Sequence, residues 1–376
     1  MAYEIDFIGV GTDVKQDASA ICMRWKVRGG DGNEIYKVAV YDGGFEEHGK
    51  RMIKHMNEYY FHDPNNEKNA SDKFIDLVIV SHPDRDHATG IKYILENFKV
   101  GKLVMNRPWL YIDELWDKVN DGRITKESLE KRLREQYGVI AELEEIANRK
   151  KIPIVEAFQG ELLENVMMVC SPGKQFYLDL LAESAKTPFE GKVGAGATII
   201  QRGLKKFKNY ILSLAESWDK ELLREDVETS ADNEMSLVIR GAINGSGFLL
   251  CGDAGIRALD VTINYLNTQG EDIRETVSFY EVPHHGSRHN VTPSILDRLI
   301  GDKVGYDDEG KNTAFVSAAV ESDHPLRMVT NAFRRRGVKV YKTSDGIICH
   351  RDGDMPERGW NSVEEIGFYE EVEEWT

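Results

Sequence analysis

The chain has few cysteines, no long apolar run and no excess of basic residues. Its four cysteines are far apart among 376 residues and form no Cys-x-x-Cys pair, so we expect buried reduced thiols and neither disulfides nor a cysteine metal site. No uninterrupted apolar run approaches the roughly 18 residues of a membrane span, and the first residues lack the basic flank and apolar centre of a signal peptide. These absences favour a cytoplasmic protein without membrane contact.

Basic residues are outnumbered: Lys and Arg total 48 against 64 Asp and Glu, a formal charge of −16. Broad nonspecific adhesion to a nucleic-acid backbone needs a basic surface, so only a local basic patch would serve it here. One such cluster, in which basic side chains surround Phe207 and Tyr210, is Arg202, Lys205, Lys206 and Lys208. It is typical either of a solvated helix face or of a lid or nucleic-acid contact.

The length suits either one large α/β domain with insertions or two ordinary domains, and the core needs no covalent cross-links. Short β-branched runs alternate with segments of helical spacing, among them an amphipathic stretch at about 127–150 that predicts one exposed helix. We expect a single domain over 1–376, with a helical insertion at 175–232 and an acidic tail at 351–376. The insertion is a candidate lid, dimer contact or partner surface, and the tail is either solvated or docked.

The most informative stretch is Ser81-His82-Pro83-Asp84-Arg85-Asp86-His87. It directly follows the apolar run 74–80, which predicts a buried strand, so the cluster falls on the turn at the carboxyl end of that strand. Imidazole and carboxylate groups at this spacing can point into one pocket and bind two divalent ions. Of the other histidines nearby, His48, His55 and His62 are better explained as surface or helix-packing residues.

Four further polar clusters each follow a predicted strand. They are Asp42, Asp253, the pair His284 and His285, and His324. Because strand ends on one side of a sheet converge on one cleft, we expect these distant residues to meet the cluster at 82–87. The sequence therefore predicts a metal site assembled from five strand ends.

With these motifs in their order, the chain resembles the metallo-β-lactamase superfamily, and within it the hydrolase domain of ComEC-type DNA-uptake proteins. Besides residues 81–87, the resemblance rests on a set of short motifs spread over nearly the whole chain: Asp17-Ala18, Asp42-Gly43, Ser171-Pro172, Asp232-Asn233, Cys251-Gly252-Asp253, Pro283-His284-His285-Gly286-Ser287 and Asp323-His324-Pro325. It implies an α/β fold of the αββα sandwich type.

The resemblance also implies the roles of the site residues. His82 and Asp84 would bind one ion, Asp86 and His87 the other, and Asp253 both. His285 would complete the second ion, while His284 would lie near the substrate or just outside the metal ligands. Two divalent ions, Zn²⁺ or Mn²⁺, would share a hydroxide as nucleophile. We expect Asp86, His284 and His324 to contribute to catalysis, His324 as a donor and not as a ligand.

Two features depart from the family pattern. Ser171 stands where many members have a third histidine for the first ion, and no membrane segment accompanies the domain as it does in ComEC proteins. The leading functional hypothesis is a phosphodiesterase or nuclease acting on nucleic acid or a nucleotide. The alternatives are hydrolysis of a carbon ester, thioester or lactam, and a metal-binding regulatory module of a multi-protein system.

Overall fold

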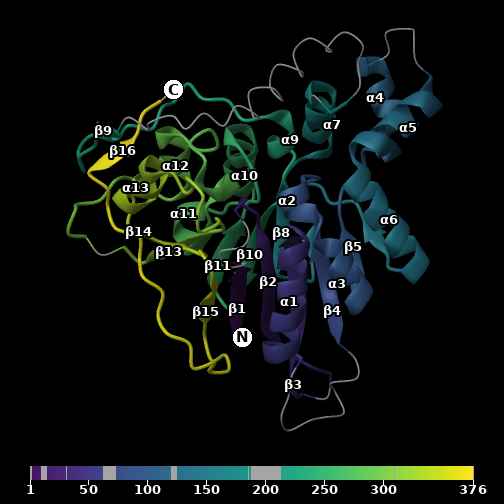
Figure 1. Ribbon diagram of the computed structural model, residues 1–376, viewed down its shortest axis with the longest axis horizontal. Helices are drawn as coiled ribbons and strands as arrows, with labels where there is room; N and C mark the ends of the chain where they lie inside the picture. Colours follow the sequence, from purple (N-terminus) through teal and green to yellow (C-terminus); the bar gives the residue numbers. More distant parts are fainter. Residues whose placement is uncertain are drawn as a thin grey trace.

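Two seven-stranded mixed sheets lie face to face, with helices covering the outer face of each (Figure 1). The computed structural model describes residues 2–9, 15–30, 32–61, 73–119, 125–184, 186–187, 213–308 and 310–375. Its four layers of helix, sheet, sheet and helix confirm the predicted fold class. In the described residues no helix is both long and apolar enough to cross a membrane.

The first sheet has the strand order β15-β1-β2-β3-β4-β5-β6. Its strands are β1 (Tyr3–Ile8), β2 (Ala20–Arg28), β3 (Glu34–Gly43), β4 (Phe74–Ile79), β5 (Lys99–Val104), β6 (Ile154–Val155) and β15 (Ile347–Asp352). From β3 to β6 neighbouring strands are parallel, whereas β15, β1, β2 and β3 pair antiparallel. The carboxyl ends of β3 and β4 therefore lie side by side.

The second sheet has the order β14-β13-β12-β11-β10-β8-β7. Its strands are β7 (Leu162–Leu163), β8 (Met167–Ser171), β10 (Val238–Ile243), β11 (Ser246–Leu250), β12 (Phe279–Glu281), β13 (Asn312–Val316) and β14 (Val338–Lys342). From β11 to β14 the pairing is parallel, so the carboxyl ends of these four strands lie at the same edge of the sheet.

Three apolar cores hold the layers together. The middle core, between the sheets, takes alternate residues of each strand; in β1 these are Tyr3, Ile5 and Phe7. The intervening residues Glu4 and Asp6 face the helices and are also fully buried. The outer cores bury one face of each helical layer against a sheet.

The helices divide between the two outer layers. Those packed on the first sheet are α1 (Glu46–Tyr59), α2 (Arg85–Ala88), α3 (Ile91–Asn97), η2 (Pro108–Tyr111), α4 (Ile112–Val119), α5 (Lys126–Gln136), α6 (Gly138–Lys150) and α7 (Lys174–Glu183). On the other side lie α9 (Ala231–Glu234), α10 (Ile256–Thr268), α11 (Ile273–Thr276), η3 (Pro283–Gly286), α12 (Pro293–Leu299) and α13 (Arg327–Arg335).

The single exposed helix expected at 127–150 is wrong in two respects. The chain breaks at Tyr137 into α5 and α6, because Tyr137 leaves helical geometry with φ −98° and ψ 42°. The apolar stripe is also buried against the first sheet, including Leu133 and Leu143. The charged face of a helix has the same sequence pattern whether its apolar face packs on a core or not, so the pattern does not reveal the burial.

Within the expected insertion at 175–232, the described helices are α7 and, at its end, α9. Residues 213–230 contain the short strand β9 (Ser213–Ala215), a turn closed by the Ser217–Lys220 bridge, and irregular chain. The basic cluster at residues 202–208 and Tyr210 lies outside the described residues, as does His62.

The tail packs against the domain, and its strand β16 (Glu371–Glu373) pairs antiparallel with β9. All four cysteines are free thiols, as expected.

Candidate metal centre

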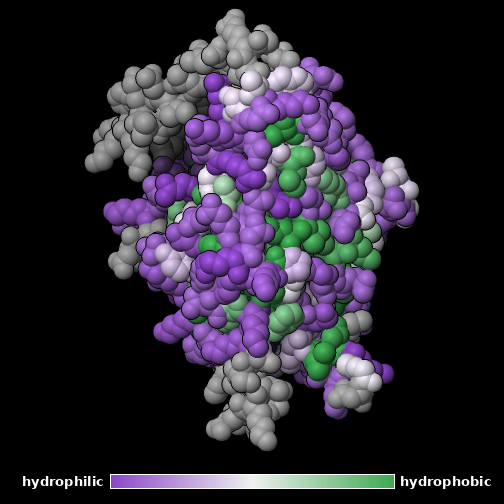
Figure 2. Space-filling model, turned by 90° about the vertical axis from the view of Figure 1, so that its right-hand side faces the viewer, coloured by the Kyte–Doolittle hydropathy of each residue, from purple (hydrophilic) through white to green (hydrophobic). Residues whose placement is uncertain are grey.

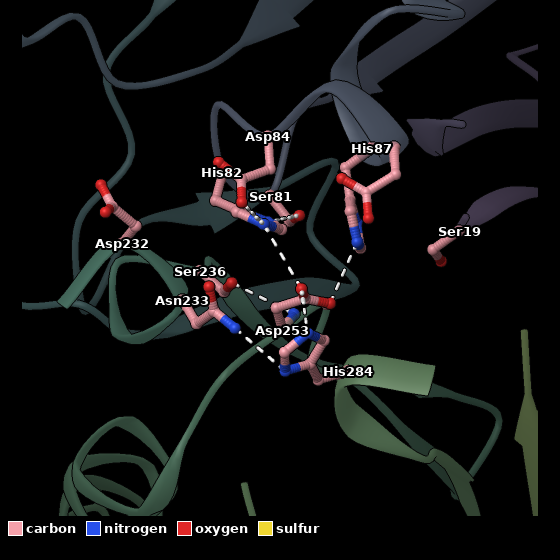
Figure 3. A network of polar contacts seen from close by, with 12 residues as sticks. Ser19, Ser81, His82, Asp84, His87, Asp232, Asn233, Ser236, Asp253 and His284 are labelled. Atoms are coloured by element: carbon pink, nitrogen blue, oxygen red, sulfur yellow. Dashed lines mark hydrogen bonds and ion pairs between the residues drawn. The ribbon is translucent and has the colours of Figure 1, made fainter. Parts of the chain in front are cut away.

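The predicted site residues meet where the two sheets open at one edge. His82 and Asp84 lie on the turn after β4, and Asp86 and His87 on the short helix α2 that follows. The second sheet supplies Asp253 after β11 and the pair 284–285 in η3 after β12. Figure 3 shows His82 and His87 approaching Asp253 from one side and His284 from the other.

Asp253 lies between two groups of imidazoles. Its Oδ2 is 3.7 Å from His82 Nε2 and 3.4 Å from His284 Nε2, whereas its Oδ1 is 3.0 Å from His87 Nε2. Beyond His87, His285 Nε2 is 3.6 Å from Asp86 Oδ2. The buried carboxylate thus directs one oxygen at His87 and the other at His82 and His284.

Each of these four histidines is held at its Nδ1 by a partner outside the cluster. The partners are Ser81 Oγ for His82 (2.9 Å), Asp42 Oδ2 for His87 (2.8 Å), Asn290 Oδ1 for His284 (2.8 Å) and the Ser317 carbonyl for His285 (2.8 Å). Such contacts fix the ring orientation and the tautomer of a metal-binding histidine. All four Nε2 atoms consequently point inward.

The tautomer of His82 follows from the neighbouring hydrogen bonds. Ser81 donates its single hydroxyl proton to Asp42 Oδ2 at 2.5 Å, so its oxygen accepts from His82 Nδ1–H. In the neutral ring, His82 Nε2 therefore carries a lone pair directed at the cluster. His284 Nδ1 lies between two amides, 2.8 Å from Asn290 Oδ1 and 3.0 Å from Asn233 Nδ2, which together hold the ring in place.

Several of the inward atoms are buried without a hydrogen bond from any described residue: His82 Nε2, His87 Nε2, His285 Nε2 and Asp253 Oδ1. Leaving a buried polar atom unsatisfied costs about 1–3 kcal/mol, so orphaned acceptors gathered at one point need a ligand. Imidazole nitrogens with carboxylate oxygens are a donor set for Zn²⁺ or Mn²⁺. The residues present therefore fit a divalent cation, and ligand atoms close enough to hold one form two groups, His82-His87-Asp253 and Asp86-His87-His285.

The charges of the cluster are strongly coupled. Burial lowers the pKa of His87, but the carboxylates of Asp253 and Asp42 outweigh it and hold that pKa well above its usual value. For Asp253 burial acts in the opposite direction, yet His284 and His87 keep its pKa well below the usual range. The carboxylates and imidazoles of the cluster thus stabilise one another's charged forms.

The structure brings together most of the predicted residues. His284 has Nε2 3.4 Å from Asp253 Oδ2, although it belongs to neither group of possible ligand atoms. Asp84 has Oδ2 3.9 Å from His82 Nε2, while its Oδ1 pairs with Lys186. His324 belongs to neither group of ligands; its Nδ1 contacts Asp17 Oδ2 at 2.9 Å.

His324 nevertheless borders the site. Leu326 donates its backbone N–H to the Gly286 carbonyl at 3.1 Å, and a Cβ on Gly286 would lie 2.4 Å from Pro325 Cβ. Gly286, at φ +84°, is therefore required by a close approach as well as by its backbone conformation. The loop that carries His324 packs directly on the turn that carries His284 and His285.

Sequence reasoning missed the residues that support the site. Asn290 orients His284, and Glu281 accepts from the backbone N–H groups of Cys251 and Gly252 just before Asp253. Lys186 lies far along the chain from the residues it contacts. Only the polar stretch after His285 was a signal for Asn290, and no spacing rule identified the other two.

A third group with metal-ligand geometry lies apart from the site: Asp6, Cys22 and His55. Asp6 already forms a 2.8 Å ion pair with Arg358 and a 3.0 Å contact with His55. Burial raises the pKa of the Cys22 thiol well above its usual value, so that thiol stays protonated. This group is a buried ion-pair network, and His55, like the buried His48, is a helix-packing residue as expected.

No family model matches the chain, and no curated protein matches it. Among solved structures, one that is similar is the crystal structure of a long form RNase Z from yeast, with 13% sequence identity and a TM-score of 0.36. The match covers 84% of this chain but only 37% of that one. A likeness of this degree establishes neither a family nor a function, and these comparisons give no support to the narrower resemblance to ComEC-type proteins.

Proposed function

We propose that the chain is a hydrolase dependent on two divalent metal ions, and specifically a phosphodiesterase that acts on nucleic acid or a nucleotide. The observation that carries this proposal is Asp253, whose two oxygens face separate sets of inward-directed imidazoles. A carboxylate so placed suits a pair of cations held close together, and paired cations suit the in-line displacement at a phosphodiester.

The chain's own residues would divide the work as follows. His82, Asp84 and His284 would hold one ion, Asp86, His87 and His285 the other, and Asp253 both. When bound, the ions supply Lewis acidity and lower the pKa of a water molecule toward about 7. Ser81, Asp42 and Asn290 keep the ligands in place. Asp84, a hard oxygen ligand where many metallo-β-lactamase-like proteins have histidine, favours Mn²⁺ relative to an all-histidine site.

His324 would act on the leaving group. Asp17 accepts from its Nδ1 and also from the Ser322 hydroxyl at 2.6 Å and the Ala319 backbone N–H at 2.8 Å. This fixed carboxylate orients the ring, and Lys342 donates to the His324 carbonyl at 2.9 Å. A held imidazole beside the ligands can donate a proton to a departing alkoxide, which is worth about 10²–10⁴ in rate.

The test is a metal count on purified protein followed by hydrolysis of bis-(p-nitrophenyl) phosphate with added Mn²⁺ or Zn²⁺. We expect two ions per chain and metal-dependent turnover in the wild type. Asp253→Ala should lose metal and at least about 100-fold in rate while keeping its circular dichroism spectrum.

Wild-type protein that binds metal but cleaves only p-nitrophenyl acetate or nitrocefin would replace the phosphodiesterase with the ester or lactam alternative. Metal binding without turnover of any of the three substrates would favour a regulatory module.

A further inference from the structure

The turn after α7 is fixed against the metal centre. Ser184 and Thr187 are buried, and the Ser184 hydroxyl donates to Asp232 Oδ1 at 2.8 Å. Ser184 Oγ itself accepts from the Lys186 backbone N–H at 3.0 Å and from the Tyr137 hydroxyl at 3.3 Å. This hydroxyl, bonded on three sides, sets the direction in which the Lys186 side chain leaves the turn.

The Lys186 ammonium pairs with a predicted metal ligand. Its Nζ donates to Asp84 Oδ1, while Asp84 Oδ2 is the oxygen that lies nearer His82 Nε2. Asp232 Oδ1 lies 3.8 Å from the same Nζ. Lys186 is thus beside the first ligand set and on the outer oxygen of Asp84, where it leaves the inner oxygen available to a cation.

The Lys186 ammonium has N–H donors left for a bound anion. An ammonium carries three donors, and among the described residues it makes one hydrogen bond, to Asp84, because the Asp232 contact is too long. The side chain is 32% exposed, so a substrate can reach it. A lysine side chain is ordinarily charged at neutral pH.

The rest of the site is acidic. Asp42, Asp84, Asp86, Asp232 and Asp253 gather around it, and no other Lys or Arg of the described residues forms an ion pair with a predicted ligand. An anionic substrate approaching this edge meets repulsion from any carboxylate that metal does not neutralise. A lysine within the cluster offsets that repulsion at one defined point.

We propose that Lys186 forms an anion subsite, in which its ammonium binds a non-bridging oxygen of the phosphodiester beside the first metal position. This inference rests on the proposed function and deepens it, because it selects anionic esters over neutral ones. Lys186 is then a substrate-binding residue contributed by the 175–232 insertion. The rival role, in which it only supports Asp84 as a ligand, predicts a different result for metal binding.

The experiment compares Lys186→Met, which keeps the apolar stem but removes the charge, with Lys186→Gln and Lys186→Arg. Lys174→Gln is the matched control, since Lys174 begins α7 and pairs with Glu114 on the exposed surface at 2.9 Å. Each variant is loaded with stoichiometric metal, and three quantities are measured: metal content, the affinity for inorganic phosphate by calorimetry, and KM and kcat for bis-(p-nitrophenyl) phosphate.

We expect Lys186→Met and Lys186→Gln to keep the wild-type metal content, to bind phosphate about 10-fold more weakly and to raise KM by a similar factor. Lys186→Arg should recover most of the phosphate affinity, and Lys174→Gln should match the wild type.

Loss of metal in both neutral variants would overturn the proposal and make Lys186 a support for Asp84. Unchanged phosphate affinity with full metal content in either folded variant would also overturn it. If the wild type binds metal and phosphate but hydrolyses no diester, the proposed function fails while the phosphate comparison still decides the subsite.

Discussion

Hydrogen bonds to the Nδ1 atoms of the histidines should determine the metal affinity of each candidate position. Ser81 supports only His82, whereas Asp42 supports both Ser81 and His87. Removing such a partner typically costs 10–100-fold in metal affinity. The two positions should therefore respond separately to changes in these two residues.

We predict that Ser81→Ala weakens one of the two bound ions by about 10–100-fold and leaves the other near wild type. His82 loses its acceptor, but His87 keeps Asp42. Competition with a chromogenic chelator measures the two affinities. Ser294→Ala is the control, because it removes a similar hydroxyl–carboxylate bond, to Glu225 at 2.6 Å, away from the site. Equal weakening of both ions would contradict the separate assignment of His82 and His87.

Glu281 should make the metal-free protein sensitive to pH. Burial raises its pKa to about 7 from the usual 4.5, although two backbone N–H groups partly offset the burial. The folded carboxyl binds its proton more tightly than the unfolded one. Its contribution to stability is thus fully present below about pH 4.5 and is lost as pH rises through 7, on the order of 3 kcal/mol.

Glu281→Gln should remove this loss, so that the metal-free variant gains stability over the wild type between pH 5 and pH 8. Urea unfolding at several pH values measures the difference. Glu161→Gln, at an exposed position, should leave the wild-type pH dependence in place. A wild type whose unfolding free energy is flat over this range would show that Glu281 is ionised throughout.

At the residue scale, the sequence predicted the ligands better than their surroundings. Residues 82–87 lie within one turn, so their convergence follows from spacing alone. The positions of Asn290 and Lys186 depend on how a loop and a helix end pack, which a motif does not encode. The family pattern assigned the second ion to His285 and left His284 near the substrate or just outside the ligands; its contact with Asn290 lies on Nδ1, and its Nε2 is 3.4 Å from Asp253 Oδ2.

At the scale of the elements, the tail segment after β15 fastens the edge of the first sheet. Arg358 inserts between β1 and α1, pairs with Glu4 and with Asp6, and stacks near Tyr59 and Trp360. Glu4 and Asp6 are fully buried, on the helix-facing side of β1. Two buried carboxylates in one strand are tolerable only with cations held against them.

We predict that Arg358→Ala lowers the free energy of unfolding by about 3–5 kcal/mol, since it leaves buried carboxylates without their main cation. Arg274→Ala removes a pair with Asp272 on the exposed surface and should cost no more than about 1 kcal/mol. Chemical denaturation compares the two variants. A loss in Arg358→Ala as small as in the control would mean that Arg24, 2.5 Å from Glu4, suffices.

The elements themselves were largely predictable because apolar runs and their polar ends alternate clearly. The exception at 127–150 arose at Tyr137, where a helical sequence continues through a break that only tertiary packing sets. The docking of the tail was left open for a similar reason. Its acidic residues suggested solvation, but Glu365 pairs with Arg334 and Glu373 accepts from the Arg327 backbone N–H at 2.9 Å. Arg358, Trp360 and Trp375 add ring contacts.

At the scale of the whole molecule, charge limits the choice of substrate. The net charge is −16, and the side of the molecule shown in Figure 2 is mostly hydrophilic with scattered apolar patches. A long polyanion would then need a local basic surface, whereas a nucleotide or a short diester would need only the metal ions and Lys186.

We predict that replacing Lys205, Lys206 and Lys208 together with Gln lowers turnover of polymeric DNA or RNA at least about 10-fold and leaves bis-(p-nitrophenyl) phosphate unaffected. The physical reason is that a polyanion can place several phosphates on a basic cluster at once, whereas a small diester has only the one phosphate that is cleaved. Rates on both substrates, measured at two salt concentrations, provide the comparison. Equal effects on both, or none on either, would leave the cluster as a solvated surface.

The candidate metal centre takes its ligands from segments of both sheets, and this division has a consequence for folding. His82 and His87 belong to the first sheet, and Asp253 and His285 to the second, so neither sheet alone offers a complete set. A cation held by both acts as a cross-link that exists only in the native state, and its binding energy is added to the cooperativity between the sheets. Chelation should therefore lower the melting temperature and also let the two sheets unfold in separate steps, visible as hydrogen exchange that becomes faster in one sheet before the other.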